Sequence, residues 1–322
     1  MKIDRKMSRM CSMIGSTGTF GIAVNELAKE YQDMCVVTAD LEVFSGLERF
    51  RHQFPENLYN VGIAEQNLIG VAAGLASEGI KTFAATYASF ASTRALDQVR
   101  ISMGYMKIPV KLVGLTAGFS AGILGATHMA LEDIAIMRAI PDITILSPAD
   151  CMEAIKCMEA ALEYPHPVYI RLTGTKRMPM VYQEDYRYEI GKAVLLREGG
   201  DICILATGSM VNSAMKMGKK LEQSDISTSV YNVHTIKPLD QTLTAELGNY
   251  SMIVTIEEHS VTGGLGGAIA EVLAGWSSHP RLLRLGVEDY YPHAGTYNHL
   301  LDEAGLSEGK MFDKIVNFYN QA

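Results

Sequence analysis

One carboxylate, Glu65, lies where an extended segment turns into an apolar helix, within the run YNVGIAEQN. The following residues, 68–75, are almost wholly apolar, with Gly70 and Gly74 four apart, so we expect this helix to be buried on all sides. Glu65 then lies near the positively polarised N-terminal end of the helix. A half-buried carboxylate is positioned there for chemistry, although an isolated first-turn glutamate more often only complements the helix dipole.

Two aromatic residues and a histidine follow further along the chain. Tyr87 and Phe90 come directly after a predicted strand at 81–85, where α/β folds place their ligand crevices. Two aromatic rings in such a turn can clasp a flat ligand, although an isolated pair of this kind is more often part of the core. A stretch rich in Gly, Ala and Ser, residues 114–127, then leads to His128. A histidine at the end of such a loop is a candidate for proton transfer or substrate binding.

The elements that must position these residues follow an α/β pattern, in which short Val- and Ile-rich runs alternate with helical periodicity. Strands are predicted at residues 35–38, 81–85, 110–115, 143–146 and 168–171. Helices are predicted at residues 20–31, 65–78, 92–103, 131–140 and 151–163. Periodicity fails at 173–187, which indicates a linker, and further strands are predicted at 202–206, 228–233, 252–257 and 282–285. The sequence thus predicts two parallel-sheet α/β domains, over residues 1–182 and 188–322.

The amino-acid composition limits the kinds of molecule that the protein is expected to bind. The chain has 322 residues, and its 48% hydrophobic content can fill two cores. A formal net charge of −8 argues against nucleic acid or an anionic membrane as the main partner. The five cysteines form no CxxC pair, so neither a disulfide framework nor a zinc site is indicated, and a cytoplasmic location is expected. No run of about 18 apolar residues occurs, so we expect neither a membrane-spanning helix nor a secretory leader.

The order and spacing of several segments resemble the C-terminal half of transketolase. These segments, which span essentially the whole chain, are GIAEQN, TYASF, TRALDQVR, GATHMALEDIAIMR, LSPAD, TIKPLD and EEHSVTGGLGGAIAE. The resemblance implies a pyrimidine-binding domain followed by a transketolase C-terminal domain. It also implies thiamine diphosphate as cofactor and the transfer of a two-carbon ketol unit from a ketose to an aldose.

The resemblance assigns roles to five residues. In that family the glutamate matching Glu65 hydrogen-bonds the aminopyrimidine ring of the cofactor, and the aromatic residue matching Phe90 stacks on that ring. Tyr87 matches a neighbouring pocket residue, and Asp40 is expected to contact the cofactor. His128 matches a position that faces the thiazolium and the reacting end of the substrate. Glu65 and His128 are therefore the predicted catalytic residues.

Two motifs that such enzymes use to bind the cofactor diphosphate and Mg²⁺ do not occur here: a GDG segment and a later asparagine pair. The nearest string, Gly199-Gly200-Asp201, opens a predicted strand, and we assign the glycine-rich run at 263–267 to a helix start. The resemblance therefore implies an N-terminal subunit that supplies the diphosphate and metal site, with two copies of each subunit in a heterotetramer. No metal ligand is expected in this chain.

The substrate end departs from the common pattern. The arginine, serine and arginine that usually hold the sugar phosphate are matched by Gly18, Phe44 and Gly174. Arg171 is the predicted replacement for binding the substrate's anionic group, with Lys176 and Arg177 close in sequence. The distal group of the sugar can therefore be phosphate, sulfonate or neutral.

Two alternatives remain open. The first is the β subunit of a 2-oxo-acid dehydrogenase or a deoxyxylulose-phosphate-synthase-like enzyme. The dehydrogenase shares the GIAEQ glutamate, but MALEDIAIMR and LSPAD after His128 favour transketolase over it. A non-catalytic scaffold subunit is the second. Glu65, Phe90 and His128 argue against it, because a buried carboxylate without a function only costs desolvation energy.

Overall fold

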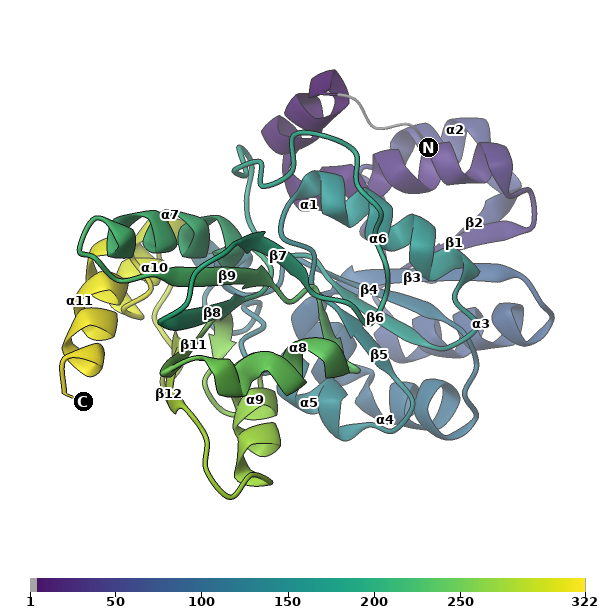
Figure 1. Ribbon diagram of the computed structural model, residues 1–322. Helices are drawn as coiled ribbons and strands as arrows, with labels where there is room; N and C mark the ends of the chain where they lie inside the picture. The colour runs from purple at the N-terminus through teal and green to yellow at the C-terminus, as the bar shows by residue number, and fades with distance from the viewer. Residues whose placement is uncertain (1–4, 322) are drawn as a thin grey trace.

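The computed structural model describes residues 5–321, in which two sheets lie side by side with helices on their faces (Figure 1). The seven-stranded sheet has the order β10-β5-β6-β4-β3-β1-β2, and the five-stranded sheet has the order β12-β11-β8-β9-β7. All neighbouring strands are parallel except the β10–β5 and β7–β9 pairs. The predicted class, two mostly parallel α/β sheets, is confirmed.

The strands of the first sheet are β1 (Met34–Thr38), β2 (Leu58–Asn60), β3 (Lys81–Tyr87), β4 (Lys111–Leu115), β5 (Thr144–Leu146), β6 (Val168–Arg171) and β10 (Thr235–Lys237). Those of the second are β7 (Val194–Arg197), β8 (Ile202–Ala206), β9 (Thr228–Asn232), β11 (Met252–Ser260) and β12 (Arg281–Val287). The sequence did not predict β2, β7 or β10, of which β2 and β7 are short and partly exposed.

The α-helices of the first half are α1 (Arg5–Glu30), α2 (Glu48–Gln53), α3 (Glu65–Ser77), α4 (Leu96–Gln98), α5 (Asp133–Ala139) and α6 (Cys151–Glu163). Those of the second half are α7 (Met210–Glu222), α8 (Gln241–Glu246), α9 (Leu265–Ala274), α10 (Tyr297–Glu303) and α11 (Glu308–Tyr319). Shorter turns of 3-10 helix are η1 (Pro55–Asn57), η4 (Phe119–Leu124) and η5 (Leu247–Asn249), and π-helix forms η2 (Phe90–Arg94) and η3 (Val99–Tyr105). No helix in this described part of the chain is long and apolar enough to cross a membrane.

The core lies on both faces of the first sheet, which explains why its central strands are continuous apolar runs. Successive residues of a strand point to opposite faces, so Val36 joins the cluster that contains Phe20 of α1, whereas Val37 joins the cluster that contains Leu68 of α3. Figure 1 shows α1 and α6 on one side of this sheet and α3 on the other. The prediction that α3 is buried on all sides is wrong, because Gln66, Asn67, Gly70 and Gly74 are exposed along one stripe.

The two halves of the chain are interleaved. Strand β10, from the second half, pairs antiparallel with β5 of the first sheet through Thr235 and Leu146. Residues 172–193, between β6 and β7, form no helix or strand, in agreement with the predicted linker. Because β10 belongs to the second half by sequence and to the first sheet by pairing, the domain bounds 1–182 and 188–322 stay a prediction.

Candidate functional site

The loop before α3 is shaped by hydrogen bonds of Asn60, at the carboxyl end of β2. Its Oδ1 accepts from the backbone N–H groups of Asp40 (3.1 Å) and Gly62 (2.9 Å), and its Nδ2 donates to Asp40 Oδ1 (3.3 Å). Both Asp40 and Gly62 have positive φ angles, 59° and 73°. This packed turn brings Asp40, which follows β1, to the same sheet edge as Glu65, the first residue of α3.

Glu65 is buried and held by one arginine. Its side chain is 4% exposed, and Arg94 Nη1 donates to both carboxylate oxygens at 2.9 Å. The Arg94 guanidinium also lies 3.9 Å from the centroid of the Phe90 ring. Pairing and hydrogen bonding offset the cost of burying the carboxylate. A cavity of about 490 Å³ adjoins the pair and is lined by Glu65 and Arg94 among others.

Sequence reasoning missed Arg94, although the TRALDQVR segment contains it. The π-helix η2 explains its position, because the Ala95 N–H donates to the Phe90 carbonyl (3.1 Å), five residues back. A π-helical turn is wider than an α-helical one and is frequent at functional sites. On a helix, a residue four positions after an aromatic residue is close enough to contact it. The spacing of Arg94 from Phe90 was therefore the signal that the sequence offered for Arg94.

The structure brings Tyr87, Phe90 and His128 together. Their ring centroids are 5.6 Å apart for Tyr87 and Phe90, 5.3 Å for Tyr87 and His128, and 5.2 Å for Phe90 and His128, all edge to face. Phe44 extends the cluster, with its centroid 5.1 Å from that of Tyr87. Burial raises the pKa of Tyr87, which keeps its phenol neutral. We call Phe44, Tyr87, Phe90 and His128 the aromatic cluster.

Arg171 does not face a ligand site. Its side chain is 1% exposed, and its Nε donates to Asp133 Oδ2 at 2.8 Å. Its Nη2 donates to the carbonyls of Ala130 (3.1 Å) and Glu258 (2.9 Å). These contacts tie the segment after His128 to β11. We therefore correct the prediction that Arg171 binds substrate and assign it to the core.

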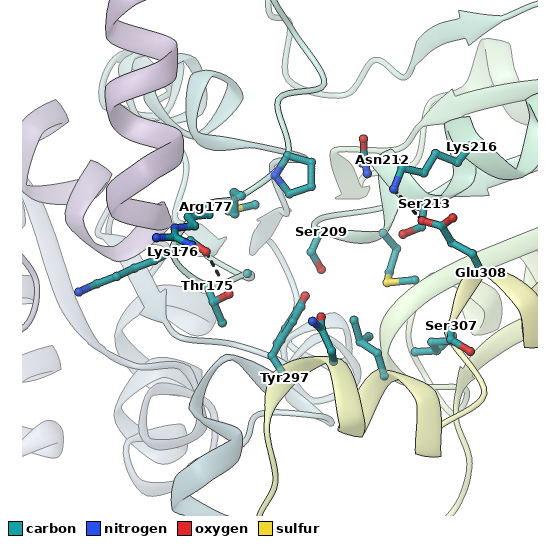
Figure 2. Close-up of a pocket in the computed structure, with 17 residues that line it drawn as sticks. Thr175, Lys176, Arg177, Ser209, Asn212, Ser213, Lys216, Tyr297, Ser307 and Glu308 are labelled. Atoms are coloured by element: carbon teal, nitrogen blue, oxygen red, sulfur yellow. Dashed lines mark hydrogen bonds and ion pairs between the residues drawn. The ribbon is translucent and has the colours of Figure 1, made fainter.

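The substrate-end positions identified in the sequence line one cavity of about 550 Å³, which we call the distal cavity. Gly18, Phe44 and Gly174 all contribute to it, as does Lys176. Because Phe44 also belongs to the aromatic cluster, the distal cavity adjoins that cluster. Arg177 instead lines a neighbouring cavity of about 580 Å³ between the linker, α7 and α10, which is drawn in Figure 2.

Fold and site together define a two-sheet α/β protein that presents a buried carboxylate and an aromatic cluster at the carboxyl edge of its first sheet. Comparison with known proteins gives the family. Residues 13–177 match the family model "Transketolase, pyrimidine binding domain", and residues 191–311 match "Transketolase, C-terminal domain". The chain belongs to the transketolase family, where it corresponds to the C-terminal subunit of split transketolases.

Several relatives resemble the chain over most of their length. A putative transketolase C-terminal section of Methanocaldococcus jannaschii is 38% identical over 92% of this chain and 94% of its own. A 6-deoxy-6-sulfo-D-fructose transketolase subunit of Clostridium sp. is 41% identical over 88% of this chain and 87% of its own. An apulose-4-phosphate transketolase subunit of Phocaeicola vulgatus is 34% identical over 95% of this chain and 98% of its own. A solved split gene transketolase, described as an inactive β4 tetramer, superposes with a TM-score of 0.87 at 38% identity, over 94% and 98% of the two chains.

Proposed function

We propose that this chain is the C-terminal subunit of a thiamine-diphosphate-dependent transketolase, which transfers a two-carbon ketol unit from a ketose to an aldose. The observation that carries the proposal is the buried Glu65 carboxylate, whose partner Arg94 lies over the Phe90 ring, with His128 against the same ring. A separate N-terminal subunit would hold the diphosphate and Mg²⁺, in a heterotetramer with two copies of each chain. Relatives of matching length that are named as a section or a subunit support this part of the proposal.

The residues present fit the pyrimidine half of the cofactor. An aminopyrimidine is a flat ring with nitrogen atoms at its edge, which suits an aromatic face next to a carboxylate. Phe90 supplies the face and Glu65 supplies a carboxyl group that can share a proton with a ring nitrogen, with Tyr87 and Asp40 as further contacts. Arg94 donates to both Glu65 oxygens, so the proton shared between one of these oxygens and a ring nitrogen would replace one of these hydrogen bonds. The Arg94 side chain is 46% exposed and therefore has room to turn aside.

Each residue of the site then has a defined task. Thiamine diphosphate, when bound, supplies the carbon nucleophile and the electron sink for cleaving and forming the carbon–carbon bond. Glu65 holds the proton that it shares with a pyrimidine ring nitrogen, and its burial limits the water that competes for that proton. His128 hydrogen-bonds the substrate oxygen on which negative charge develops. Its Nδ1 lies 2.9 Å from Thr127 Oγ1, a contact that orients the imidazole.

The test is Glu65→Gln in the chain purified together with its N-terminal subunit, thiamine diphosphate and Mg²⁺. We expect ketol transfer to fall about 10²- to 10⁴-fold, the range for losing a positioned proton-transfer group. The matched control is Asp97→Asn, because Asp97 is an exposed carboxylate of the same region whose one ion pair within residues 5–321 is with Arg100. If Glu65→Gln kept most of the activity, the proton-holding role would be wrong. If the isolated chain turned over ketoses, the need for a second subunit would be wrong.

A further inference from the structure

The Arg94 guanidinium touches both of the groups to which the proposed function assigns the pyrimidine ring. It lies over the face of the Phe90 ring, 3.9 Å from the ring centroid. Its Nη1 donates to both carboxylate oxygens of Glu65, each at 2.9 Å. A flat group that stacked on this face of Phe90 and hydrogen-bonded Glu65 would therefore have to occupy the place that Arg94 fills.

A guanidinium and an aminopyrimidine bind to such a place in similar ways. Each is flat and delocalised, and each carries N–H groups at its edge that can donate to a carboxylate. A guanidinium is held over an aromatic face by cation–π attraction, whereas a second aromatic ring is held there by stacking. Arg94 thus satisfies the Glu65 carboxylate, which is 4% exposed, much as a bound ring would.

The contact of Arg94 with Glu65 is looser than the ion pair of Arg171 with Asp133. Arg171 is 1% exposed and also donates to two backbone carbonyl groups. Arg94 is 46% exposed, and within residues 5–321 its guanidinium hydrogen-bonds Glu65 alone, through one nitrogen atom instead of the usual two. Because an ion pair with an exposed partner contributes little to stability, exchanging Arg94 for another donor costs little.

The backbone of Arg94 is fixed, so only its side chain has to move. The Ala95 N–H donates to the Phe90 carbonyl at 3.1 Å within η2, and Gln66 Nε2, on α3, donates to the Arg94 carbonyl at 3.3 Å. The cavity of about 490 Å³ beside Glu65 adjoins the guanidinium. This cavity leaves room for the side chain to turn away without a shift of η2 or α3.

We propose that Arg94 is an internal competitor of the cofactor, whose side chain occupies the pyrimidine site of the free chain and turns aside when the cofactor binds. The inference rests on the proposed function and adds an inhibitory contact to it. This contact keeps the buried Glu65 carboxylate paired before the cofactor arrives. It also lowers the apparent affinity for the ring, because only the fraction of molecules in which Arg94 has turned aside can bind it.

The affinity for thiamine diphosphate tests the proposal in the chain purified with its N-terminal subunit and Mg²⁺. Arg94→Ala removes the group that covers Phe90 and pairs with Glu65. If Arg94 closes the site in about nine molecules of ten, this variant lowers the Kd measured by calorimetry about tenfold. The matched control is Arg100→Ala, which removes an exposed cation of the same region, paired with Asp97, and should leave the Kd unchanged. An unchanged or raised Kd for Arg94→Ala would overturn the proposal.

The stability of the chain alone tests whether the contact exists before the cofactor binds. Removing Arg94 leaves a buried carboxylate without its partner, which destabilises the fold. We expect Arg94→Ala to lower the melting temperature at pH 7 by about 2–4 °C, and the double variant with Glu65→Gln to recover most of this loss. If Arg94→Ala melted at the same temperature as Arg100→Ala, Arg94 would not pair with Glu65 in the free chain and the proposal would be wrong.

A fragment of the cofactor separates this inference from the proposed function. The aminopyrimidine half of thiamine, as its hydroxymethyl derivative, carries no diphosphate and is titrated into the chain alone without metal. We expect Arg94→Ala to bind it about tenfold more tightly than wild type, and the double variant with Glu65→Gln to lose this gain. If this pattern held while the complex transferred no ketol unit, the proposed function would fail and the inference would stand. If the complex were active but neither the fragment nor thiamine diphosphate distinguished Arg94→Ala from wild type, only the inference would fail.

Discussion

Replacing Arg171 by methionine distinguishes a structural role from a substrate contact. Arg171 and Asp133 form an ion pair in which the side chains are 1% and 0% exposed. Removing one partner of a buried pair leaves the other charge uncompensated, which costs about 3–5 kcal/mol. Two carbonyl groups, of Ala130 and Glu258, would lose a donor as well. We expect Arg171→Met to lower the free energy of unfolding by about 3–5 kcal/mol, a large part of the 5–15 kcal/mol typical of folded proteins.

The measurement is guanidinium-induced unfolding at pH 7, followed by circular dichroism. Arg177→Met is the matched control, because Arg177 is an exposed cation in the linker and its loss should change the free energy by less than about 0.5 kcal/mol. The double variant Arg171→Met with Asp133→Leu removes both charges and should recover much of the loss, since apolar replacements of buried pairs are often neutral. A single variant within about 1 kcal/mol of wild type, with a raised KM for the sugar, would refute the reasoning and return Arg171 to the substrate site.

Two further perturbations test how the halves of the chain are joined, and a third, Gly70→Ala, is a control away from the contact between them. Burial lowers the pKa of His259 from 6.5 to about 4, and its Nε2 accepts from the Ile134 N–H at 3.1 Å. The neutral His259 ring therefore contributes its full stabilisation above pH 6.5. This contribution decreases by roughly 3 kcal/mol as the pH falls from 6.5 towards 4. His259→Gln should flatten the dependence of the free energy of unfolding on pH in that range. Gly118→Ala should destabilise the chain by about 1–3 kcal/mol, because Gly118 has φ 64° and a Cβ would lie 2.2 Å from Glu258 Oε1. Gly70→Ala, at an exposed helical position with open space, should instead stabilise by about 0.5–1 kcal/mol in thermal or chemical unfolding.

The central strands could be predicted because they are buried on both faces. Strand β1, observed at Met34–Thr38, and β8, at Ile202–Ala206, are continuous apolar runs, and such runs leave few alternatives. Strand β10 could not be predicted, since it has three residues and its pairing with β5 depends on a contact about 90 residues away in sequence. The segment 5–19 of α1 was also missed, since the predicted helix begins at residue 20. Its glycines and serines are poor helix formers, and contacts with the linker at Met178 hold it in place.

The candidate site also contains residues that the sequence could single out and one, Arg171, that it misassigned. Glu65, Phe90 and His128 could be singled out because Glu65 opens a helix, Phe90 follows a strand and His128 ends a glycine-rich loop. The structure places the Phe90 ring against both His128 and Arg94, the partner of Glu65, and the roles of the three residues stay predictions. Arg171 was misassigned because sequence gives the charge of a residue but not the direction of its side chain. It occupies the last position of β6, and its guanidinium turns into the core, where Asp133 at the start of α5 receives it. The direction of the Arg171 side chain is determined only by the tertiary contact between β6 and α5.

Exposed apolar side chains around the site bear on the proposed second subunit. Ile63, which lines the cavity at Glu65, is 77% exposed, and Val43 and Phe44, which line the distal cavity, are 71% and 44% exposed. Large apolar residues that gather at one edge of a protein often mark a surface for another molecule. A carboxylate that must exclude water to hold its proton needs a cover over these residues. A second chain that supplies the diphosphate and metal would provide that cover, so the same contact would complete the cofactor site and close the cavity that Glu65 shares with Arg94.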